Sequence, residues 1–284
     1  MFDLTGFLNS LQRRTAIMGI VNASGDSFSG NGNVSADSAL ALALAHLDCG
    51  ADLLDIGGES TRPGAGETPV NLELHRVIPV IRNLKKVHPE TVISVDTRHW
   101  EVAQQALAAG AQIINDVSML RHSPRIAELA AETGAGLIIS HSRGTPENMM
   151  EESFCSYPSG VAAMVADELA AARETALRAG VKAENILLDP GFGFAKNADQ
   201  CWELVRDLKQ ISPLSGLLAG VSRKSFLGAL TGEKDPSRRG GETLALELIL
   251  AAQGVGVIRT HAVRELHNAL KVMEKTGSMV KTNE

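Results

Sequence analysis

Short apolar segments alternate with helix-like segments along the chain from residue 16 onward, and this alternation limits the possible folds more than any other feature. The apolar segments are rich in Val, Ile and Leu and lack an alternating polar face. Such segments are typical of strands that are buried on both faces of a parallel sheet. We expect strands within residues 16–22, 51–57, 91–97, 111–117, 136–142, 185–191, 216–222 and 255–261.

The segments between these strands have the spacing and end signals of helices. Residues 35–50 are rich in Ala and Leu and end at Gly50, and another helical segment begins near Pro69. About eight strand–helix units predict an α/β protein that folds as a single-domain (β/α)8 TIM barrel. We assign residues 1–15 to an N-terminal extension and 16–280 to the barrel. A doubly wound open sheet is the alternative fold, and a loop is expected between the seventh strand and its helix.

Charge and cysteine usage exclude several classes of protein. The formal net charge is -6, which argues against a nucleic-acid partner, because nucleic-acid binding requires clustered positive charge. The three cysteines are scattered and favour a reducing compartment. No apolar run approaches the length of a membrane span, and no signal peptide is evident at the N-terminus. We therefore expect a cytoplasmic protein without a membrane partner.

Polar residues occupy the carboxyl ends of the expected strands. In a barrel these ends meet at one mouth, where the strand–helix loops build the active site. Both acids and bases occur in the set, which favours a functional site over side chains that simply reach solvent. The set comprises Asn22, Asp55, Asp96, Asn115, Asp116, His141, Asp189, Ser222, Arg259 and His261.

Three short motifs at these ends indicate chemistry. Residues 222–225 (SRKS) place two cations after a strand, but they lack the spacing of a Walker A loop. Arg259 and His261 are two residues apart, so they project to the same face and can donate to phosphate oxygens. Residues 189–196 (DPGFGFAK) fail the dinucleotide fingerprint because Lys196 replaces its third glycine. An NAD-linked enzyme is therefore excluded.

The remaining histidines and cysteines give no metal signal. No H-x-x-x-H spacing or Cys/His cluster predicts a transition-metal site. We assign no role to the histidines within or beside the helical segments, which are His46, His75, His88, His99, His122 and His267.

Taken together, several segments resemble the dihydropteroate synthase family of pterin-binding barrels. GGESTRPG (57–64), DPGFGF (189–194) and SRKSF (222–226) are the most specific of them, and they occur in the family's order. The resemblance covers nearly the whole chain from residue 16. It implies condensation of 6-hydroxymethyl-7,8-dihydropterin pyrophosphate with p-aminobenzoate, which gives 7,8-dihydropteroate and pyrophosphate. It also implies a Mg2+ cofactor and a homodimer.

The resemblance also assigns roles to individual residues, with Asp96, Lys224 and Asp26 as the catalytic candidates. The pterin-pocket positions are Asp96, Asn115, Asp189 and Lys224. The pyrophosphate positions are Asn22, Arg259 and His261, and Asn22 is also the Mg2+ ligand. The positions around p-aminobenzoate are Thr61, Arg62, Pro63, Phe28, Phe194 and Ser225.

Several positions depart from the family's pattern. Gly25 replaces a proline of the first loop, which should make that loop harder to order. Ser140 replaces a methionine of the pterin pocket, so we expect a smaller and more polar wall there, and Ala195 replaces a glycine. Two alternatives remain open. One is a paralogue that binds pterins without turnover or with altered specificity, and the other is a pterin-dependent methyltransferase domain.

Overall fold

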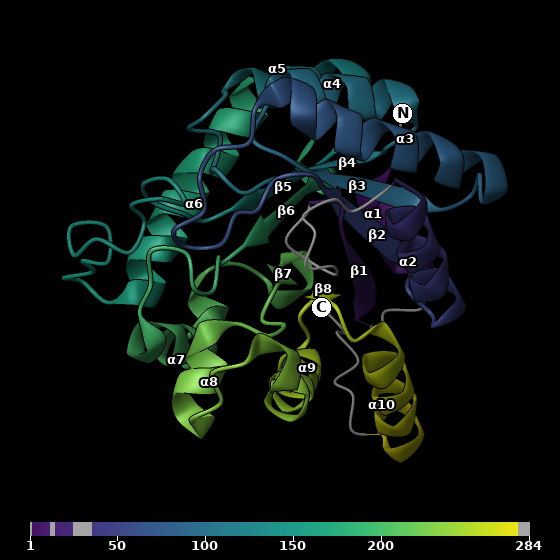
Figure 1. Ribbon diagram of the computed structural model, residues 1–284. Coiled ribbons are helices and arrows are strands. Elements are labelled where there is room, and N and C mark those ends of the chain that lie inside the picture. The colour runs from purple at the N-terminus through teal and green to yellow at the C-terminus, as the bar shows by residue number, and fades with distance from the viewer. Residues whose placement is uncertain (1, 12–14, 25–35, 278–284) are drawn as a thin grey trace.

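Eight parallel strands form the centre of the structure, a computed structural model that describes residues 2–11, 15–24 and 36–277 (Figure 1). The strands are β1 (Ala16–Asn22), β2 (Leu53–Gly57), β3 (Val92–Asp96), β4 (Ile113–Asp116), β5 (Gly136–Ser140), β6 (Ile186–Asp189), β7 (Leu218–Ala219) and β8 (Val257–Thr260). Each lies inside a segment expected to be a strand, because Val, Ile and Leu suit a strand covered on both sides.

The strand order closes the sheet into a barrel. Strand β1 pairs with both β2 and β8, and the order runs β6-β5-β4-β3-β2-β1-β8-β7. A parallel bridge between Leu188 and Leu217 joins β6 to the residue before β7. The predicted (β/α)8 barrel is therefore confirmed, and the open-sheet alternative is wrong.

Helices surround the strands, and Figure 1 shows most of them as a ring in chain order from α2 to α10. Among the described residues the α-helices are α1 (Leu4–Ser10), α2 (Ala36–Asp48), α3 (Val70–Val87), α4 (Trp100–Ala109), α5 (Arg125–Thr133), α6 (Val161–Arg178), α7 (Ala198–Arg206), α8 (Ser225–Thr231), α9 (Gly240–Gln253) and α10 (Val263–Thr276). Short 3-10 turns are η1 (Ala183–Asn185), η2 (Leu208–Gln210), η3 (Leu214–Gly216) and η4 (Pro236–Arg238). None of the helices in the described ranges is long and apolar enough to cross a membrane.

Two of these helices were not expected. Helix α8 occupies the stretch after the seventh strand that was predicted to be a loop, and that prediction is wrong. Two of its large apolar side chains, Phe226 and Leu227, are buried. Helix α1 lies in the segment assigned as an extension, where Leu4 packs among strand residues. The division into residues 1–15 and 16–280 stays a prediction.

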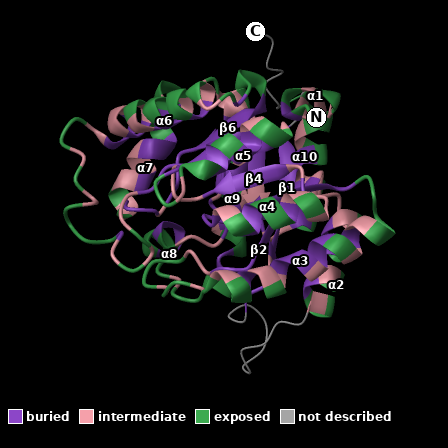
Figure 2. Ribbon diagram, turned by 90° about the horizontal axis from the view of Figure 1, so that it is seen from above, coloured by how far each residue is buried: buried purple, intermediate pink, exposed green. Residues whose placement is uncertain are grey.

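The side chains that point into the barrel are apolar near the amino ends of the strands and polar near their carboxyl ends. One inward layer contains an apolar residue from every strand together with Leu4 of α1. Its strand members are Ala16, Met18, Leu53, Val92, Ile113, Ile138, Leu187, Leu218 and Val257. Two residues further along, the same face carries polar side chains such as Asp55 after Leu53 and Arg259 after Val257, because strand side chains repeat every second residue. Figure 2 shows the strands as the buried centre of the molecule.

Candidate active site

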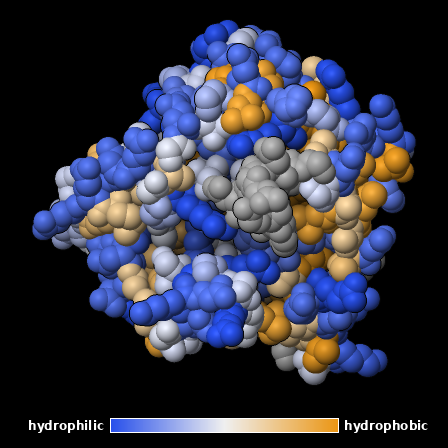
Figure 3. All heavy atoms as spheres, in the orientation of Figure 1, coloured by the Kyte–Doolittle hydropathy of each residue, from blue (hydrophilic) through white to orange (hydrophobic). Residues whose placement is uncertain are grey.

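A cavity of about 380 Å³ opens at the carboxyl ends of the strands. In Figure 3, hydrophilic side chains gather near the centre of the face that carries it. The cavity brings together every described residue to which the sequence assigned a substrate role. These are Asn22, Thr61, Arg62, Pro63, Asp96, Asn115, Asp189, Phe194, Lys224, Ser225, Arg259 and His261. Asp26 and Phe28 lie outside the described residues.

A buried ion-pair network joins three strands at the cavity. Arg259 Nε donates to Asp55 Oδ2 at 2.6 Å, and Nη2 donates to Asp96 Oδ2 at 2.7 Å. Burial opposes the charge of Arg259, but the two carboxylates outweigh it and raise its pKa. Burial also raises the pKa of Asp96, while Arg259 lowers it. Asp96 Oδ1 is buried without a partner among the described residues, so it can accept a hydrogen bond from a ligand.

The network continues along the inner wall to Asp189. Asn115 Nδ2 donates to Asp55 Oδ2 at 3.0 Å. Ser140 Oγ lies 3.4 Å from Asn115 Oδ1 and 3.3 Å from Asp189 Oδ2. Asp189 Oδ1 accepts the backbone N–H of Gly191 at 2.8 Å, and burial raises the pKa of this carboxyl. The Asn115 amide and the Asp189 carboxylate are thus held in fixed orientations at the cavity wall.

Ser140 takes a different position from the one expected of the methionine it replaces. Its side chain is fully buried and does not line the cavity. The hydroxyl instead lies between two expected pterin-binding side chains, Asn115 and Asp189. The departure therefore changes how these two residues are supported rather than adding a polar patch to the wall.

Lys224 and Phe194 form one side of the cavity. Lys224 Nζ lies 4.0 Å from the centre of the Phe194 ring, a cation–π contact. Burial lowers the pKa of Lys224 to about 8, and Asp189 acts in the opposite direction. The ammonium and the aromatic ring together suit a flat, electron-rich ligand.

Hydrogen bonds from Lys196 stabilise the loop that carries Phe194. This fully buried amine contacts His141 Nδ1 at 2.8 Å and donates to the carbonyls of Gly191 and Phe194 at 3.1 Å each. Burial lowers its pKa to about 7. Ala195, which replaces the family's glycine, adopts a positive φ of 50°, so the usual glycine there has a clear conformational reason.

His261 is neutral in this site. Burial, followed by the nearby charges of Arg223 and Arg259, lowers its pKa to about 3. Ser222 Oγ accepts the backbone N–H of His261 at 3.2 Å and lies 3.0 Å from Nδ1. If the hydroxyl donates to Nδ1, the ring proton resides on Nε2, where it can be donated to an anion.

The loop between β2 and α3 is fixed by a charge pair that sequence patterns did not reveal. Arg98 donates through Nε and Nη2 to the two oxygens of Glu59, at 2.9 Å each. Glu59 also accepts the N–H of Thr68 at 3.0 Å. Thr61, Arg62 and Pro63 lie two to four residues after Glu59 and line the cavity. No motif spacing links positions 59 and 98, so only the tertiary structure reveals their pairing.

Three further residues support the site, although the sequence analysis assigned them no role. Asp55 and Ser222 are among the polar residues at strand ends, and the structure gives them supporting contacts to Arg259 and His261. Arg239 also lines the cavity, and its guanidinium donates to the carbonyl of Arg223 at 2.9 Å. It lies between η4 and α9, in the part of the predicted loop that contains no α-helix.

Comparison with known proteins identifies the family. The pterin binding enzyme family matches residues 18–261. The dihydropteroate synthase of Escherichia coli is 40% identical over 268 residues, which are 92% of each chain. The folic acid synthesis protein fol1 of Schizosaccharomyces pombe is 41% identical over 88% of this chain. This chain spans about a third of the length of such fungal relatives.

Solved structures agree with the sequence relatives. Among them are structures of Xanthomonas albilineans dihydropteroate synthase with 4-aminobenzoic acid and with 7,8-dihydropteroate. They match with TM-scores of 0.84 and 0.81 at 38% and 35% identity. Each match covers 93% of this chain. It covers 93% of the chain bound to 4-aminobenzoic acid and 94% of the chain bound to 7,8-dihydropteroate. The chain therefore belongs to the pterin-binding enzyme family and, within it, to the dihydropteroate synthases.

Proposed function

We propose that this protein condenses 6-hydroxymethyl-7,8-dihydropterin pyrophosphate with p-aminobenzoate to give 7,8-dihydropteroate and pyrophosphate. One observation carries the proposal. All described residues expected to contact the two substrates line a single cavity at the barrel mouth. The relatives bound to 4-aminobenzoic acid and 7,8-dihydropteroate support the same pair of ligands.

The inner wall suits the pterin. Asp189 offers carboxylate oxygens to the aminopyrimidine N–H groups, and Asn115 offers both a donor and an acceptor. Lys224 donates to the pterin carbonyl. The free Oδ1 of Asp96 faces no described partner, and its charge stabilises the methylene as positive charge develops there.

The part of the cavity lined from β1 and β8 suits pyrophosphate. Arg259, His261 and Asn22 lie on β1 and β8 or directly after them, and these two strands pair. The neutral His261 donates one hydrogen bond, while Arg259 supplies charge and further N–H donors. Arg62 adds a second cation at the rim.

The remaining wall suits p-aminobenzoate. Pro63 and Phe194 provide apolar contacts to the ring, and Thr61 and Ser225 provide hydroxyls near the mouth. In the reaction, the bond between the pterin methylene and the pyrophosphate oxygen breaks, and its electron pair leaves with pyrophosphate. The arylamine nitrogen then forms a bond to the methylene and releases a proton. The cavity's contribution is to orient both substrates and to stabilise the opposite charges that develop on the methylene and on the leaving pyrophosphate.

A Mg2+ ion fits the pyrophosphate end. Asn22 supplies a hard amide oxygen on the cavity wall, and Mg2+ needs few protein ligands because it keeps water and substrate phosphate oxygens. When bound, the ion neutralises charge on the leaving pyrophosphate. We further propose a homodimer, which the resemblance to the family implies, and a cytoplasmic location, which the sequence predicts. Light scattering and cell fractionation test these two proposals.

The test is pyrophosphate release from purified protein and the pterin pyrophosphate, with and without p-aminobenzoate and with and without Mg2+. We expect release and dihydropteroate formation only when all three are present. Asp189→Asn should lose this activity, whereas the exposed Asp199→Asn should keep it. Pterin binding without turnover would identify a non-catalytic paralogue instead. Transfer of a methyl group from methyltetrahydrofolate would identify the methyltransferase alternative.

A further inference from the structure

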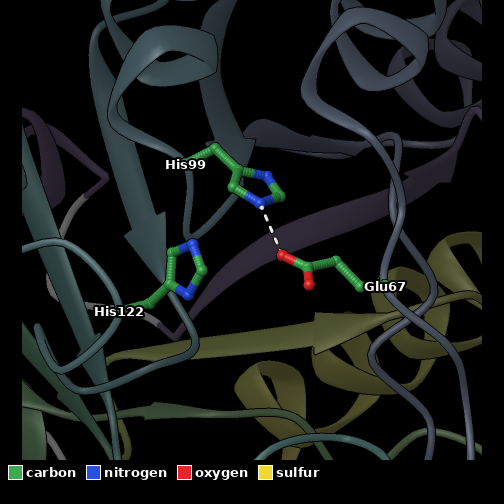
Figure 4. A group of neighbouring side chains, drawn as sticks. All are labelled: Glu67, His99 and His122. Carbon is green, nitrogen blue, oxygen red and sulfur yellow. Dashed lines mark ion pairs between the residues drawn. The ribbon is translucent and has the colours of Figure 1, made fainter.

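Three side chains outside the substrate cavity converge on one point, although no sequence pattern groups them. Glu67 lies in the β2–α3 loop, His99 immediately precedes α4, and His122 lies between β4 and α5 (Figure 4). One ligand atom from each lies within 4.8 Å of the others. The carboxyl ends of β2, β3 and β4 are neighbours in the barrel, which explains how distant positions meet.

His99 is held in the orientation of a metal ligand. Its Nδ1 lies 2.6 Å from Oε2 of Glu73, a carboxylate that is fully buried in α3. A carboxylate that accepts from Nδ1–H leaves the lone pair of Nε2 available, which is the arrangement behind most metal-bound histidines. That Nε2 faces Glu67, with 3.5 Å to its Oε1. The imidazole is thus oriented by a buried partner and aimed at a second carboxylate.

His122 and Glu67 leave the point open to solvent. The ring centre of His122 is 4.9 Å from that of His99, with the rings edge to face. Both His122 and the Glu67 side chain are exposed, whereas His99 is buried. His122 also lines a second cavity of about 430 Å³. An ion can therefore enter from solvent and keep a coordination position for water.

The nearest cation does not prevent binding. Arg98 Nη2 lies 3.5 Å from Glu67 Oε1, but its guanidinium is already paired with both oxygens of Glu59. Three carboxylates, those of Glu59, Glu67 and Glu73, surround this point, so their negative charge exceeds the single positive charge of Arg98.

We propose that Glu67, His99 and His122 bind a Zn2+ ion, with water completing the tetrahedron. Two imidazoles and one carboxylate with an open position are a typical zinc donor set. Nitrogen donors also exclude Mg2+ as the preferred ion, since Mg2+ prefers oxygen ligands. The site is thus distinct from the proposed Mg2+ position at Asn22.

Zinc at this point would tie the β2–α3 loop to the ends of β3 and β4. Glu67 is next to Thr68, whose N–H bonds to Glu59, and the same loop carries Thr61 and Pro63 at the substrate cavity. Thr61 and Phe194 line both cavities, so the two spaces are adjacent. Bound zinc would therefore restrain a loop of the active site without contacting substrate.

The experiment measures Zn2+ binding to chelator-treated full-length protein by competition with a chromophoric chelator, with excess Mg2+ present. We expect one tight Zn2+ per chain. His122→Ala and Glu67→Gln change exposed side chains, so both should fold, and each should weaken binding by about 10-fold or more. His75→Ala, an exposed histidine on α3 outside the cluster, should bind as the unchanged protein does.

A second measurement uses Co2+ in place of Zn2+, because its visible absorption reports the coordination geometry. Tetrahedral bands should appear in the unchanged protein and in His75→Ala, and should be lost in His122→Ala. Zinc affinity that is the same in His122→Ala and Glu67→Gln as in the unchanged protein overturns the proposal, as does the lack of tight binding to the unchanged protein. Neither result depends on the synthase activity.

Discussion

Arg259 Nη2 lies 2.7 Å from Asp96 Oδ2, so the cation expected to hold pyrophosphate is bound by the carboxylate expected next to the pterin methylene. In the proposed complex, the pterin methylene and the pyrophosphate would therefore both lie beside a single ion pair. In the proposed reaction, positive charge develops on the methylene and negative charge on the leaving group, and each partner of this pair would face the charge that it stabilises.

Asp96→Asn should separate these two effects. We expect kcat to fall by about 100-fold or more, because a charge aimed at the transition state is lost. Pyrophosphate, by contrast, should inhibit at a concentration a few-fold lower, since Arg259 loses a competing carboxylate. Product-inhibition kinetics measure both values. An inhibition constant that rises in the variant would mean that Arg259 does not hold pyrophosphate.

We expect the loss of a proton from Lys224 to set the pH above which activity falls. Burial lowers its pKa to about 8, so the ammonium loses its proton as pH rises through that value. We expect kcat/KM for the pterin pyrophosphate to be constant below this pH and to fall above it. Lys224→Arg keeps the charge at all accessible pH values and should shift the decline upward, even if its maximum is lower. The same alkaline decline in both proteins would assign it to another group.

We expect the buried amine of Lys196 to make the free energy of unfolding depend on pH. Its folded-state pKa is lowered to about 7 by burial, whereas an exposed lysine titrates near 10.5. Between these two pKa values the unfolded chain binds a proton that the folded chain does not. The free energy of unfolding therefore rises with pH in this range, and the destabilising effect of burying Lys196 is lost. Lys196→Met leaves two carbonyls and an imidazole unpaired, which costs about 1–3 kcal/mol when the amine is neutral.

The difference in unfolding free energy between the two proteins should thus be larger at pH 9 than at pH 6. Urea unfolding at several pH values measures it, and the comparison cancels the titration of other groups. Lys209→Met, an exposed lysine on η2, serves as the control and should show no such trend. A pH-independent difference for Lys196→Met would contradict its neutral buried state.

Ser140→Ala tests the support of the pterin wall. The hydroxyl lies 3.4 Å from Asn115 Oδ1 and 3.3 Å from Asp189 Oδ2, so its contacts are long. Losing a weak donor from two oriented acceptors should cost about 1 kcal/mol, or roughly fivefold in KM for the pterin substrate. The KM for p-aminobenzoate should not change. Equal changes in both constants would point to a general disturbance of the barrel.

The residues of the site could be predicted from the sequence to a large extent. A strand exposes every second side chain to the same side, and parallel strands in a barrel end at one mouth. The polar residues that follow apolar runs, such as Asn115 after Ile113, were therefore expected together. The structure places most of them around one cavity, because these local rules operate within each strand–helix unit, whereas Asp55, Asp116 and His141 do not line it.

Pairings between units could not be predicted, because they depend on how neighbouring loops fold. Glu59 meets Arg98, and His99 meets Glu67 and His122, only after three strands have been aligned side by side. Helix α8 was missed because its seven residues are too few for a clear periodic pattern. Sequence by itself determined the barrel, its family and the chemical character of its mouth. The tertiary structure decided which charges pair there, because ion pairs depend on distances between side chains from different strands and loops.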